Sequence, residues 1–346
     1  MSMRKIIVAI NGLGRIGRAF LRAAAKRHEL EIVAANDIAD LKNVIYLIKY
    51  DTVYGRSDFE VKMKENPQGF LIDGREVRFF SEREPARLPW KELGIDIVVE
   101  STGFFASYEK SRAHLEAGAK RVVISAPAKD EPPLGLAGAT VLMGLNESNL
   151  QTCDISSNAS CTTNAAGPII AILDEALGIE KAVLNTVHAY TASQSLVDSG
   201  NRRGFREGRA AAANIVPSST GAAAAVTKAY PRLAGLFDGI SMRVPVTSGS
   251  IVDITFTAKR NTSAEEVNGI LKKAAGEKRW QRIFSATEDE LVSSDILGSP
   301  FASIADLSMT RVVGGNLVKV LAWYDNEMGY AHTLVEHVVK AGEYVK

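Results

Sequence analysis

Apolar runs rich in β-branched residues alternate with helically spaced segments through the first half of the chain. Residues 6–10 form a continuous run of this kind, as expected for a strand buried on both faces of a sheet. Similar runs occupy 31–35, 95–100 and 121–125. Because helical spacing separates them, we predict a doubly wound parallel sheet. The stretch 58–80 departs from this rhythm, since short alternating runs broken by turn residues indicate antiparallel strands.

The second half carries longer strand-like segments. Strands are predicted at 183–191, 251–259 and 318–324, and helical spacing at 264–275. Residues 193–214 are polar, rich in Arg and Gly and without periodicity, which is typical of a functional loop, an interface or a disordered segment. We therefore predict an α/β protein whose second part is an α+β domain with a mixed or antiparallel sheet.

Length and composition narrow the class of protein. At 346 residues the chain is long for one hydrophobic core, so two domains are expected. The 41 Lys and Arg residues nearly balance the 40 Asp and Glu residues, which gives no reason to expect binding to nucleic acid or to a membrane surface. Two cysteines are too few for a disulfide framework, and no apolar run reaches the roughly 18 residues of a membrane span. We expect a cytoplasmic protein.

The first strand leads into the motif Asn-Gly-Leu-Gly-Arg-Ile-Gly-Arg, which contains Gly12, Gly14 and Gly17. Such glycines let the backbone approach a pyrophosphate, and the free N–H groups of the following helix favour an anion. Asp37 lies 20 residues beyond Gly17, where its carboxylate can accept hydrogen bonds from an adenosine ribose. We expect a Rossmann-type domain that binds NAD rather than NADP, because Asp37 would repel a 2′-phosphate. The alternative is a glycine turn that serves packing alone, with Asp37 as a solvated cap.

Ligand contacts in a doubly wound sheet gather beyond the carboxyl ends of its strands. Thr102, Gly103, Phe105 and Ser125 lie at such ends and are therefore expected near the nucleotide. Either Phe105 or its neighbour Phe104 could flank an adenine; packing in the core is the equal alternative.

One of the two cysteines, Cys161, lies in the run Ser-Asn-Ala-Ser-Cys-Thr-Thr-Asn at 157–164. Apolar residues at helical spacing follow, which predicts a polar loop that turns into a buried helix with Cys161 in its first turn. Unpaired N–H groups and the positive end of the helix dipole would stabilise a thiolate there, so a reactive thiol is expected. The alternative is an inert small residue of the core.

His188 lies near the end of the strand-like run 183–191. A lone histidine is more often structural, but an imidazole near Cys161 would lower the pKa of the thiol and could later take up a hydroxyl proton. The other histidines are expected in helical segments without comparable polar neighbours: His28, His114, His332 and His337. No Cys, His, Asp or Glu spacing is typical of a metal site, and we expect none.

Two more polar features fall in the second half. Arg243 interrupts an apolar strand, and a buried arginine requires an anion, either a structural carboxylate or a substrate phosphate. The run Ser-Ser-Thr-Gly at 218–221 opens an alanine-rich helix and suits an N-cap or a phosphate or oxyanion pocket. The polar turn 325–330 follows a strand so late in the chain that it could return to the nucleotide site.

Over nearly its whole length the chain resembles the phosphorylating glyceraldehyde-3-phosphate dehydrogenases. The resemblance is carried by the motifs at 11–18, 157–164, 186–188, 219–223, 242–245 and 323–327. It implies an NAD-binding domain of residues 1–160 completed by the C-terminal helix 325–346, and a catalytic domain of residues 161–324. It also implies a homotetramer that takes glyceraldehyde 3-phosphate, inorganic phosphate and NAD.

The resemblance further implies roles for individual residues. Cys161 would be the nucleophile and His188 its activating base. NAD contacts are implied for Arg15, Ile16, Asp37, Arg83, Ser125, Asn326 at the nicotinamide carboxamide, and Tyr330 beside the nicotinamide ring. Substrate and inorganic phosphates are implied at Ser160, Thr162, Thr191, Ser193, Thr220, Gly221 and Arg243, with Arg206 as a further candidate.

The implied reaction is oxidation of D-glyceraldehyde 3-phosphate to 1,3-bisphosphoglycerate, a step of glycolysis and gluconeogenesis, through a hemithioacetal and a thioester on Cys161. Two departures from the family pattern matter. Ala165 replaces a cysteine that many members carry, so no disulfide can form there. The loop at 199–203 lacks a proline often found in NAD-preferring members and carries two extra arginines, which leaves NADP open. Rival functions are an erythrose-4-phosphate dehydrogenase and a non-catalytic NAD-binding partner protein.

Overall fold

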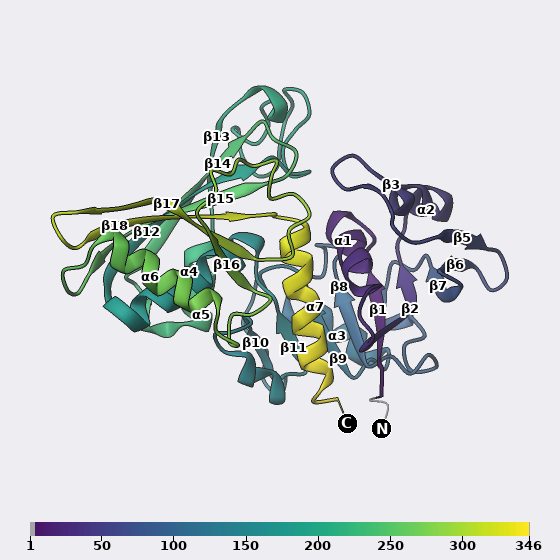
Figure 1. Ribbon diagram of the computed structural model, residues 1–346. Coiled ribbons are helices and arrows are strands. Elements are labelled where there is room, and N and C mark those ends of the chain that lie inside the picture. Colours follow the sequence, from purple (N-terminus) through teal and green to yellow (C-terminus); the bar gives the residue numbers. More distant parts are fainter. Residues whose placement is uncertain (1–3, 346) are drawn as a thin grey trace. The chain divides into compact units, whose positions relative to one another are not determined.

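The first apolar run is strand β1 (Ile6–Asn11), which lies at the centre of a nine-stranded sheet in the computed structural model (Figure 1). The structure describes residues 4–345. Across the sheet the order is β10-β11-β9-β8-β1-β2-β7-β6-β5. The flanking strands are β2 (Leu30–Asn36), β5 (Val61–Lys64), β6 (Gly69–Ile72), β7 (Arg75–Phe80), β8 (Ile97–Glu100), β9 (Arg121–Ile124), β10 (Gly138–Thr140) and β11 (Ile155–Ser157).

The pairing in this sheet follows the hydrophobic pattern. From β10 to β7 every neighbouring pair is parallel, and β1 and β8 have buried interiors because helices cover both faces. The pairs β6–β7 and β5–β6 are antiparallel, which confirms the antiparallel excursion expected at 58–80. A separate two-stranded ladder joins β3 (Tyr50–Asp51) to β4 (Gly55–Arg56).

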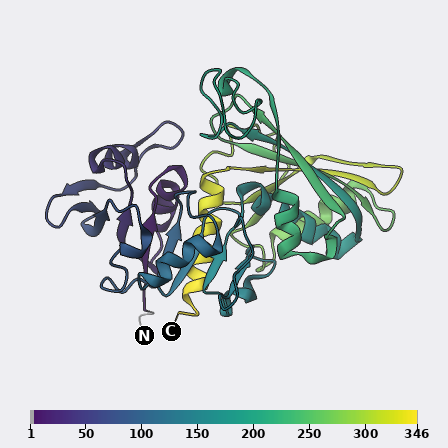
Figure 2. The same ribbon diagram turned by 180° about the vertical axis from the view of Figure 1, so that it is seen from behind.

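Helices lie on the two faces of the nine-stranded sheet. α1 (Arg15–Ala24) and the end of α7 (Met328–Gly342) lie on one face (Figure 1), and α3 (Tyr108–Glu116) lies on the other (Figure 2). α2 (Leu41–Lys49) follows β2, and the Asp40 carboxylate caps it by accepting from two backbone N–H groups. The last turns of α7 pack closely enough that a Cβ at Gly342 would meet the Ile6 side chain 2.2 Å away.

The second half forms a seven-stranded sheet in the order β13-β14-β12-β15-β18-β17-β16. Its strands are β12 (Ile179–Ala189), β13 (Val216–Ser219), β14 (Phe237–Val244), β15 (Ser250–Ala258), β16 (Phe284–Thr287), β17 (Ser303–Val313) and β18 (Leu317–Tyr324). Two pairs are parallel and the others antiparallel, as predicted for a mixed sheet. The helices α4 (Cys161–Leu177), α5 (Ala222–Ala229) and α6 (Ala264–Ala275) pack against this sheet (Figure 1).

The chain divides into two compact units. The first comprises the residues up to Ala159 together with those from Leu334 onward, and the second comprises Ser160–Thr333. The α/β fold class is confirmed. The domain limits inferred from the sequence stay a prediction. The units differ from these limits chiefly near the C-terminus, where the chain passes from the second unit back to the first inside α7. Among the described residues no helix is long and apolar enough to cross a bilayer.

Candidate active site and nucleotide pocket

The glycine motif joins β1 to α1 in a turn that two positions restrict to glycine. Gly12 has a φ of +97°, and a Cβ there would lie 2.7 Å from the Thr102 nitrogen. A Cβ at Gly17 would lie 1.9 Å from the Gly12 carbonyl oxygen. The helix is capped by Gly14, which has no side chain to bind the first N–H groups, and no acid follows in the first turn. These N–H groups are therefore available to an anion.

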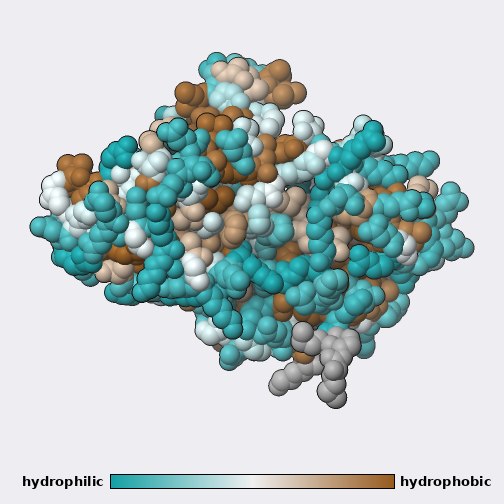
Figure 3. All heavy atoms as spheres, viewed as in Figure 1, coloured by the Kyte–Doolittle hydropathy of each residue, from teal (hydrophilic) through white to brown (hydrophobic). Residues whose placement is uncertain are grey.

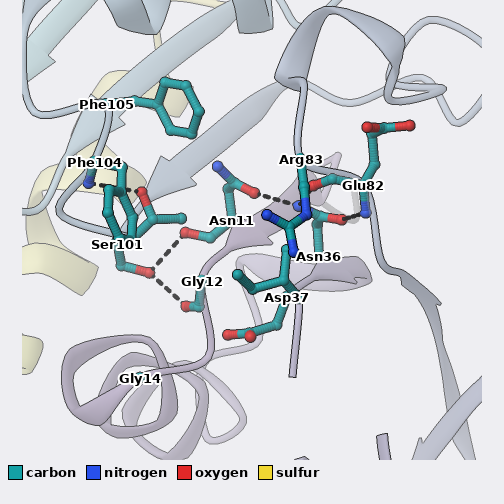
Figure 4. Close-up of a pocket in the computed structure, with 12 residues that line it drawn as sticks. Asn11, Gly12, Gly14, Asn36, Asp37, Glu82, Arg83, Ser101, Phe104 and Phe105 are labelled. Carbon is teal, nitrogen blue, oxygen red and sulfur yellow. Dashed lines mark hydrogen bonds between the residues drawn. The ribbon is translucent and has the colours of Figure 1, made fainter. Parts of the chain in front are cut away.

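Beyond the carboxyl ends of β1, β2 and β8 lies a cavity of about 380 Å³. Asp37 and Arg83 lie on one side of it and Phe104 and Phe105 on the other (Figure 4). The lining residues are Asn11, Gly12, Gly14, Asn36, Asp37, Ile38, Glu82, Arg83, Ser101, Thr102, Phe104 and Phe105. The structure thus brings together six of the residues expected to bind the nucleotide: Gly12, Gly14, Asp37, Arg83, Thr102 and Phe105.

Asp37 is held in place by the backbone around it. One carboxylate oxygen accepts from the Leu13 N–H at 2.6 Å and the other from the Ala39 N–H at 2.8 Å. The carboxylate therefore ties the end of β2 to the glycine turn while keeping lone pairs for further donors. Phe104 is 74% exposed, so it is a pocket wall rather than part of the core; Phe105 is half-buried and meets His114 edge-on.

Several other residues expected to contact NAD do not line the cavity, among them Arg15, Ile16 and Ser125. The Arg15 guanidinium forms an ion pair with Asp51. Burial would raise the pKa of Asp51, but hydrogen bonds from Arg15 and from two backbone N–H groups hold that pKa below its ordinary value. Ile16 lies in the first turn of α1, and Ser125 directly follows β9, where its N–H bonds to the Glu100 carbonyl.

Cys161 is the first residue of α4, as predicted. Ser160 is the N-cap, and its hydroxyl accepts from the Thr163 N–H at 3.1 Å. The Cys161 sulfur lies 3.4 Å from Nε2 of His188, which comes from the end of β12. The structure therefore brings the predicted thiol and imidazole within hydrogen-bonding distance, 27 residues apart in the chain.

The ionisation of this pair differs from the sequence expectation. Burial raises the pKa of the Cys161 thiol, although Arg243 and the Thr162 hydroxyl and N–H act in the opposite direction. Burial and the positive charge of Arg243 lower the pKa of His188 to about 3. The expected thiolate at the helix start was wrong for this state of the site, because desolvation outweighs the helix terminus. The pair rests as a thiol beside a neutral imidazole.

Arg243 and a carbonyl compete for the second nitrogen of His188. Nδ1 lies 2.6 Å from the Ala189 carbonyl oxygen and 2.6 Å from the Arg243 guanidinium. A guanidinium only donates and a carbonyl only accepts. The neutral tautomer with a lone pair on Nδ1 therefore satisfies Arg243, and the tautomer with a proton on Nδ1 satisfies the Ala189 carbonyl. Among the described residues no carboxylate forms an ion pair with Arg243, and the half-buried side chain is held by the imidazole and this carbonyl.

Tyr324, which sequence analysis missed, connects the two reactive elements. Its buried hydroxyl lies 2.9 Å from the Thr162 hydroxyl on α4 and 2.8 Å from the Thr186 hydroxyl on β12. Its ring meets the imidazole of His188 edge-on, with centroids 5.9 Å apart. The position of a tyrosine at the very end of a predicted strand was the available signal.

The candidate phosphate ligands fall into separate groups within the second unit. Thr191 and Ser193 share a hydrogen bond of 2.8 Å between their hydroxyls. The predicted cap at 218–221 needs correction, because its two serines belong to β13 and Gly221 is the N-cap of α5. Of this run, Thr220 accepts from the Ala222 N–H at 3.2 Å. Arg206 is exposed on the loop between β12 and β13.

Asn326 is buried with its amide orientation fixed. Its Oδ1 accepts from the Gly249 N–H at 3.0 Å and from the Ser250 hydroxyl at 3.0 Å. The oxygen is thereby occupied, which leaves Nδ2 as the group suited to an acceptor such as an amide oxygen. Tyr330 is buried in the first turns of α7.

The other histidines correct the sequence expectation. His28 lies in a turn rather than a helix. His114 and His337 are fully buried with polar partners: His114 with Trp90, Glu100 and Asn11, and His337 with Ser156 and Asn158. Among the described residues no group of three or more His, Cys, Asp or Glu side chains could hold a metal ion.

Comparison with known proteins agrees with this geometry. Residues 6–108 match the NAD binding domain of glyceraldehyde 3-phosphate dehydrogenase, and residues 160–326 match the C-terminal domain of that enzyme. The chain is 45% identical over 333 residues to the glyceraldehyde-3-phosphate dehydrogenase of Clostridium pasteurianum, covering 95% of this chain and 96% of the relative.

Two further relatives carry the same name. Identity to the Streptomyces coelicolor enzyme is 45% over 340 residues, which is 97% of this chain and 98% of the relative. Identity to the Geobacillus stearothermophilus enzyme is 44% over 331 residues, which is 95% of this chain and 96% of the relative. Such identity over nearly the whole length, with both domain models matched, shows that the chain belongs to the glyceraldehyde-3-phosphate dehydrogenase family.

Proposed function

We propose that this protein oxidises D-glyceraldehyde 3-phosphate to 1,3-bisphosphoglycerate with NAD and inorganic phosphate. The observation that carries the proposal is the 3.4 Å approach of the Cys161 sulfur to His188 Nε2, at the start of a helix and beside Arg243. A thiol paired with an imidazole is the arrangement for nucleophilic attack on a carbonyl. The family membership supplies the substrate class.

Cys161 and His188 together carry out the first step. As His188 Nε2 accepts the thiol proton, the sulfur of Cys161 adds to the aldehyde carbon; the imidazolium then returns the proton to the former aldehyde oxygen, which gives a hemithioacetal and a neutral His188. His188 then takes the proton of the hemithioacetal hydroxyl, which lets a carbonyl form again as the carbon is oxidised to a thioester. Inorganic phosphate attacks that thioester, the bond between the carbon and the Cys161 sulfur breaks, and the acyl phosphate leaves. The thiolate of Cys161 takes the proton back from His188, which restores the thiol and the neutral imidazole.

The competition for His188 Nδ1 has a role in this scheme. A phosphate anion would draw the Arg243 guanidinium into a charge-assisted hydrogen bond, because no carboxylate among the described residues pairs with this guanidinium. Nδ1–H could then donate to the Ala189 carbonyl, which leaves Nε2 as the proton acceptor that the reaction requires. Ser160, Thr162, Thr191, Ser193, Thr220, Gly221 and Arg206 are proposed as further phosphate ligands.

The nucleotide pocket fits NAD. The uncapped N–H groups behind Gly14 suit a pyrophosphate, and the Asp37 carboxylate, already aligned by Leu13, suits the hydroxyls of a ribose. When bound, NAD accepts the hydride removed from the substrate. Arg15, Ile16, Arg83 and Ser125 are proposed as contacts around the nucleotide, and Asn326 and Tyr330 as contacts of the nicotinamide. NADP remains the alternative cofactor to be tested in parallel.

We also propose a homotetramer and a cytoplasmic location. The loop between β12 and β13, at the top of Figure 1, shows hydrophobic side chains among polar ones in Figure 3, and its exposed side chains include Leu196, Val197 and Phe205. Such side chains are typical of an interface between subunits. Both cysteine thiols are free, as suits a reducing compartment. Light scattering on the purified protein tests the subunit number.

The deciding experiment measures NADH formed by the pure, reduced protein. We expect turnover of glyceraldehyde 3-phosphate that depends on inorganic phosphate, and higher catalytic efficiency with NAD than with NADP. Faster turnover of erythrose 4-phosphate would replace the substrate in this proposal. Absence of phosphate-dependent NADH production would indicate a non-catalytic NAD-binding protein instead.

A further inference from the structure

The last residues of three neighbouring strands are polar and meet beneath the nucleotide pocket. Asn11 ends β1, Asn36 ends β2 and Glu100 ends β8, and the sheet pairs Asn11 with both of the others. All three side chains are buried, with Glu100 only 2% exposed. None of them has a role in the proposed reaction. We call Asn11, Asn36, Glu100, Thr102, His114 and Trp90 the strand-end network.

Hydrogen bonds fix the orientation of each asparagine in the strand-end network. The Glu82 N–H donates to Asn36 Oδ1 at 2.8 Å, and Asn36 Nδ2 donates to the Glu82 carbonyl at 2.9 Å. Asn36 Nδ2 also donates to Asn11 Oδ1 at 2.8 Å, which turns Asn11 Nδ2 towards Glu100 (Figure 4 shows the Asn11–Asn36–Glu82 part). Neither amide can flip without losing these bonds.

The protonation of His114 follows from Trp90. The indole N–H can only donate, and it lies 3.0 Å from His114 Nδ1, so Nδ1 carries a lone pair. The proton of the neutral ring is therefore on Nε2, which lies 3.1 Å from Glu100 Oε2. Nε2 of His114 and Nδ2 of Asn11 lie 3.3 Å apart because both donate to the same oxygen.

The other oxygen of Glu100 holds the pocket loop. Oε1 accepts from both the N–H and the hydroxyl of Thr102, the former at 2.8 Å. The Thr102 hydroxyl in turn accepts from the Phe104 N–H at 3.1 Å. Donors thus converge on both oxygens of the buried Glu100 carboxylate. Asn11 and His114 donate to Oε2, and Thr102 donates to Oε1. Only a carboxylate, which accepts at both oxygens, satisfies them all.

We infer that Glu100 is a positioning residue for cofactor binding, which sets the distance between the glycine turn and the wall of residues 102–105. The inference rests on the proposed assignment of this cavity to NAD. In Glu100→Gln an NH₂ group would replace one of the two accepting oxygens. In either orientation of the amide this NH₂ group would face donors. Trp90 and His114 are fully buried and resist displacement, whereas Phe104 is exposed. The strain would therefore be relieved by the pocket wall.

The test is Glu100→Gln, with NAD affinity measured by isothermal titration calorimetry and kcat measured at saturating NAD. We expect Kd for NAD to rise at least tenfold, equivalent to about 1.4 kcal/mol, while kcat changes less than about twofold. A change confined to binding is what a positioning role in this pocket requires. General destabilisation of the fold would not produce it.

Asp96→Asn is the matched control. Asp96 is a buried carboxylate that directly precedes the first residue of β8. It accepts from the Ile7 N–H and forms ion pairs with Arg4 and Lys120. It should lower the thermal midpoint yet leave Kd for NAD within about twofold. An equal loss of NAD affinity in both variants would reduce Glu100 to a structural role and overturn the inference.

Asp37→Ala separates this inference from the assignment of the pocket. Weaker NAD binding in Asp37→Ala together with unchanged binding in Glu100→Gln would overturn the inference alone. Unchanged binding in both would overturn the assignment of the pocket as well. If Glu100→Gln does not fold, Trp90→Phe decides: it frees the proton of His114 to move to Nδ1, and Kd should rise about threefold. An unchanged Kd in that variant would overturn the inference.

Discussion

The nucleotide pocket and the thiol–imidazole site are built in opposite ways. The pocket forms where neighbouring parallel strands end, so adjacent pieces of backbone and their last residues supply most of its wall. The reactive site brings together a helix start, the ends of two strands and an arginine, and side chains hold them in place: Tyr324 joins Thr162 to Thr186. The first arrangement depends on topology, and the second depends on individual hydroxyl and imidazole groups.

Replacing the nucleophile should separate the two regions most completely. Cys161→Ser keeps the size of the side chain but removes the thiol, so phosphate-dependent NADH production should fall by roughly three orders of magnitude or more. NAD affinity should stay unchanged, because Cys161 is not among the residues that line the nucleotide cavity. Steady-state rates and calorimetric titration with NAD check both halves. Loss of NAD binding in this variant would contradict the separation.

Replacing the imidazole should have the next largest effect. His188→Asn removes the proton acceptor next to the sulfur, and kcat should fall by roughly 10²–10⁴-fold. The remaining activity should increase with pH, since the buried thiol, whose pKa is raised, must then lose its proton to solvent. A pH–rate profile measured against the parent protein checks this. A remaining rate independent of pH would argue against His188 as the base.

Acid should destabilise both units through one buried histidine in each. Burial lowers the pKa of His188 and that of His337 to about 3, so the folded state excludes a proton that the unfolded chain takes up below about pH 6.5. The contribution of each neutral histidine to the free energy of unfolding is therefore fully present above about pH 6.5. It is lost as the pH falls towards 3, and the loss is about 2 kcal/mol per histidine at pH 5. Urea unfolding at pH 7 and pH 5 measures the loss. His337→Gln should show a smaller loss than the parent protein; an equal loss would exclude His337 as a cause.

Removing the tyrosine hydroxyl should give the smallest effect. Tyr324→Phe leaves two buried threonine hydroxyls without their shared partner, which should cost about 1–2 kcal/mol of unfolding free energy and lower kcat several-fold. NAD affinity should not change. Chemical denaturation and initial rates check the two effects. A variant with full activity would show that backbone packing alone positions Cys161 and His188.

The pocket was largely predictable because its signals are local. A buried strand, three glycines and an acid at a fixed spacing indicate one structure, and Gly12, Asp37, Thr102 and Phe105 do line the cavity. What was missed there is Glu100: it ends an apolar strand, but its importance lies in donors from α3 and from β1, which sequence spacing does not reveal. His114 was dismissed for the same reason, since its partners are distant in the chain.

The reactive site was predictable only as a set of parts. The position of Cys161 at the start of α4 follows from helical periodicity, and its pairing with His188 could be proposed from chemistry. The ionisation of the thiol could not be predicted, because it depends on how completely the surrounding chain excludes water. The contact between Arg243 and His188 depends on β12 and β14 lying side by side in register, which a long loop hides from the sequence.

The unequal surroundings of the two sulfurs have a practical consequence for chemical labelling. Burial raises the pKa of both thiols, but Cys153 is buried, whereas Cys161 keeps some contact with solvent and has an imidazole beside it. An electrophilic dye or a covalent inhibitor should therefore modify a single position in the native chain. One such tag per subunit would report on the reactive centre without any engineered cysteine.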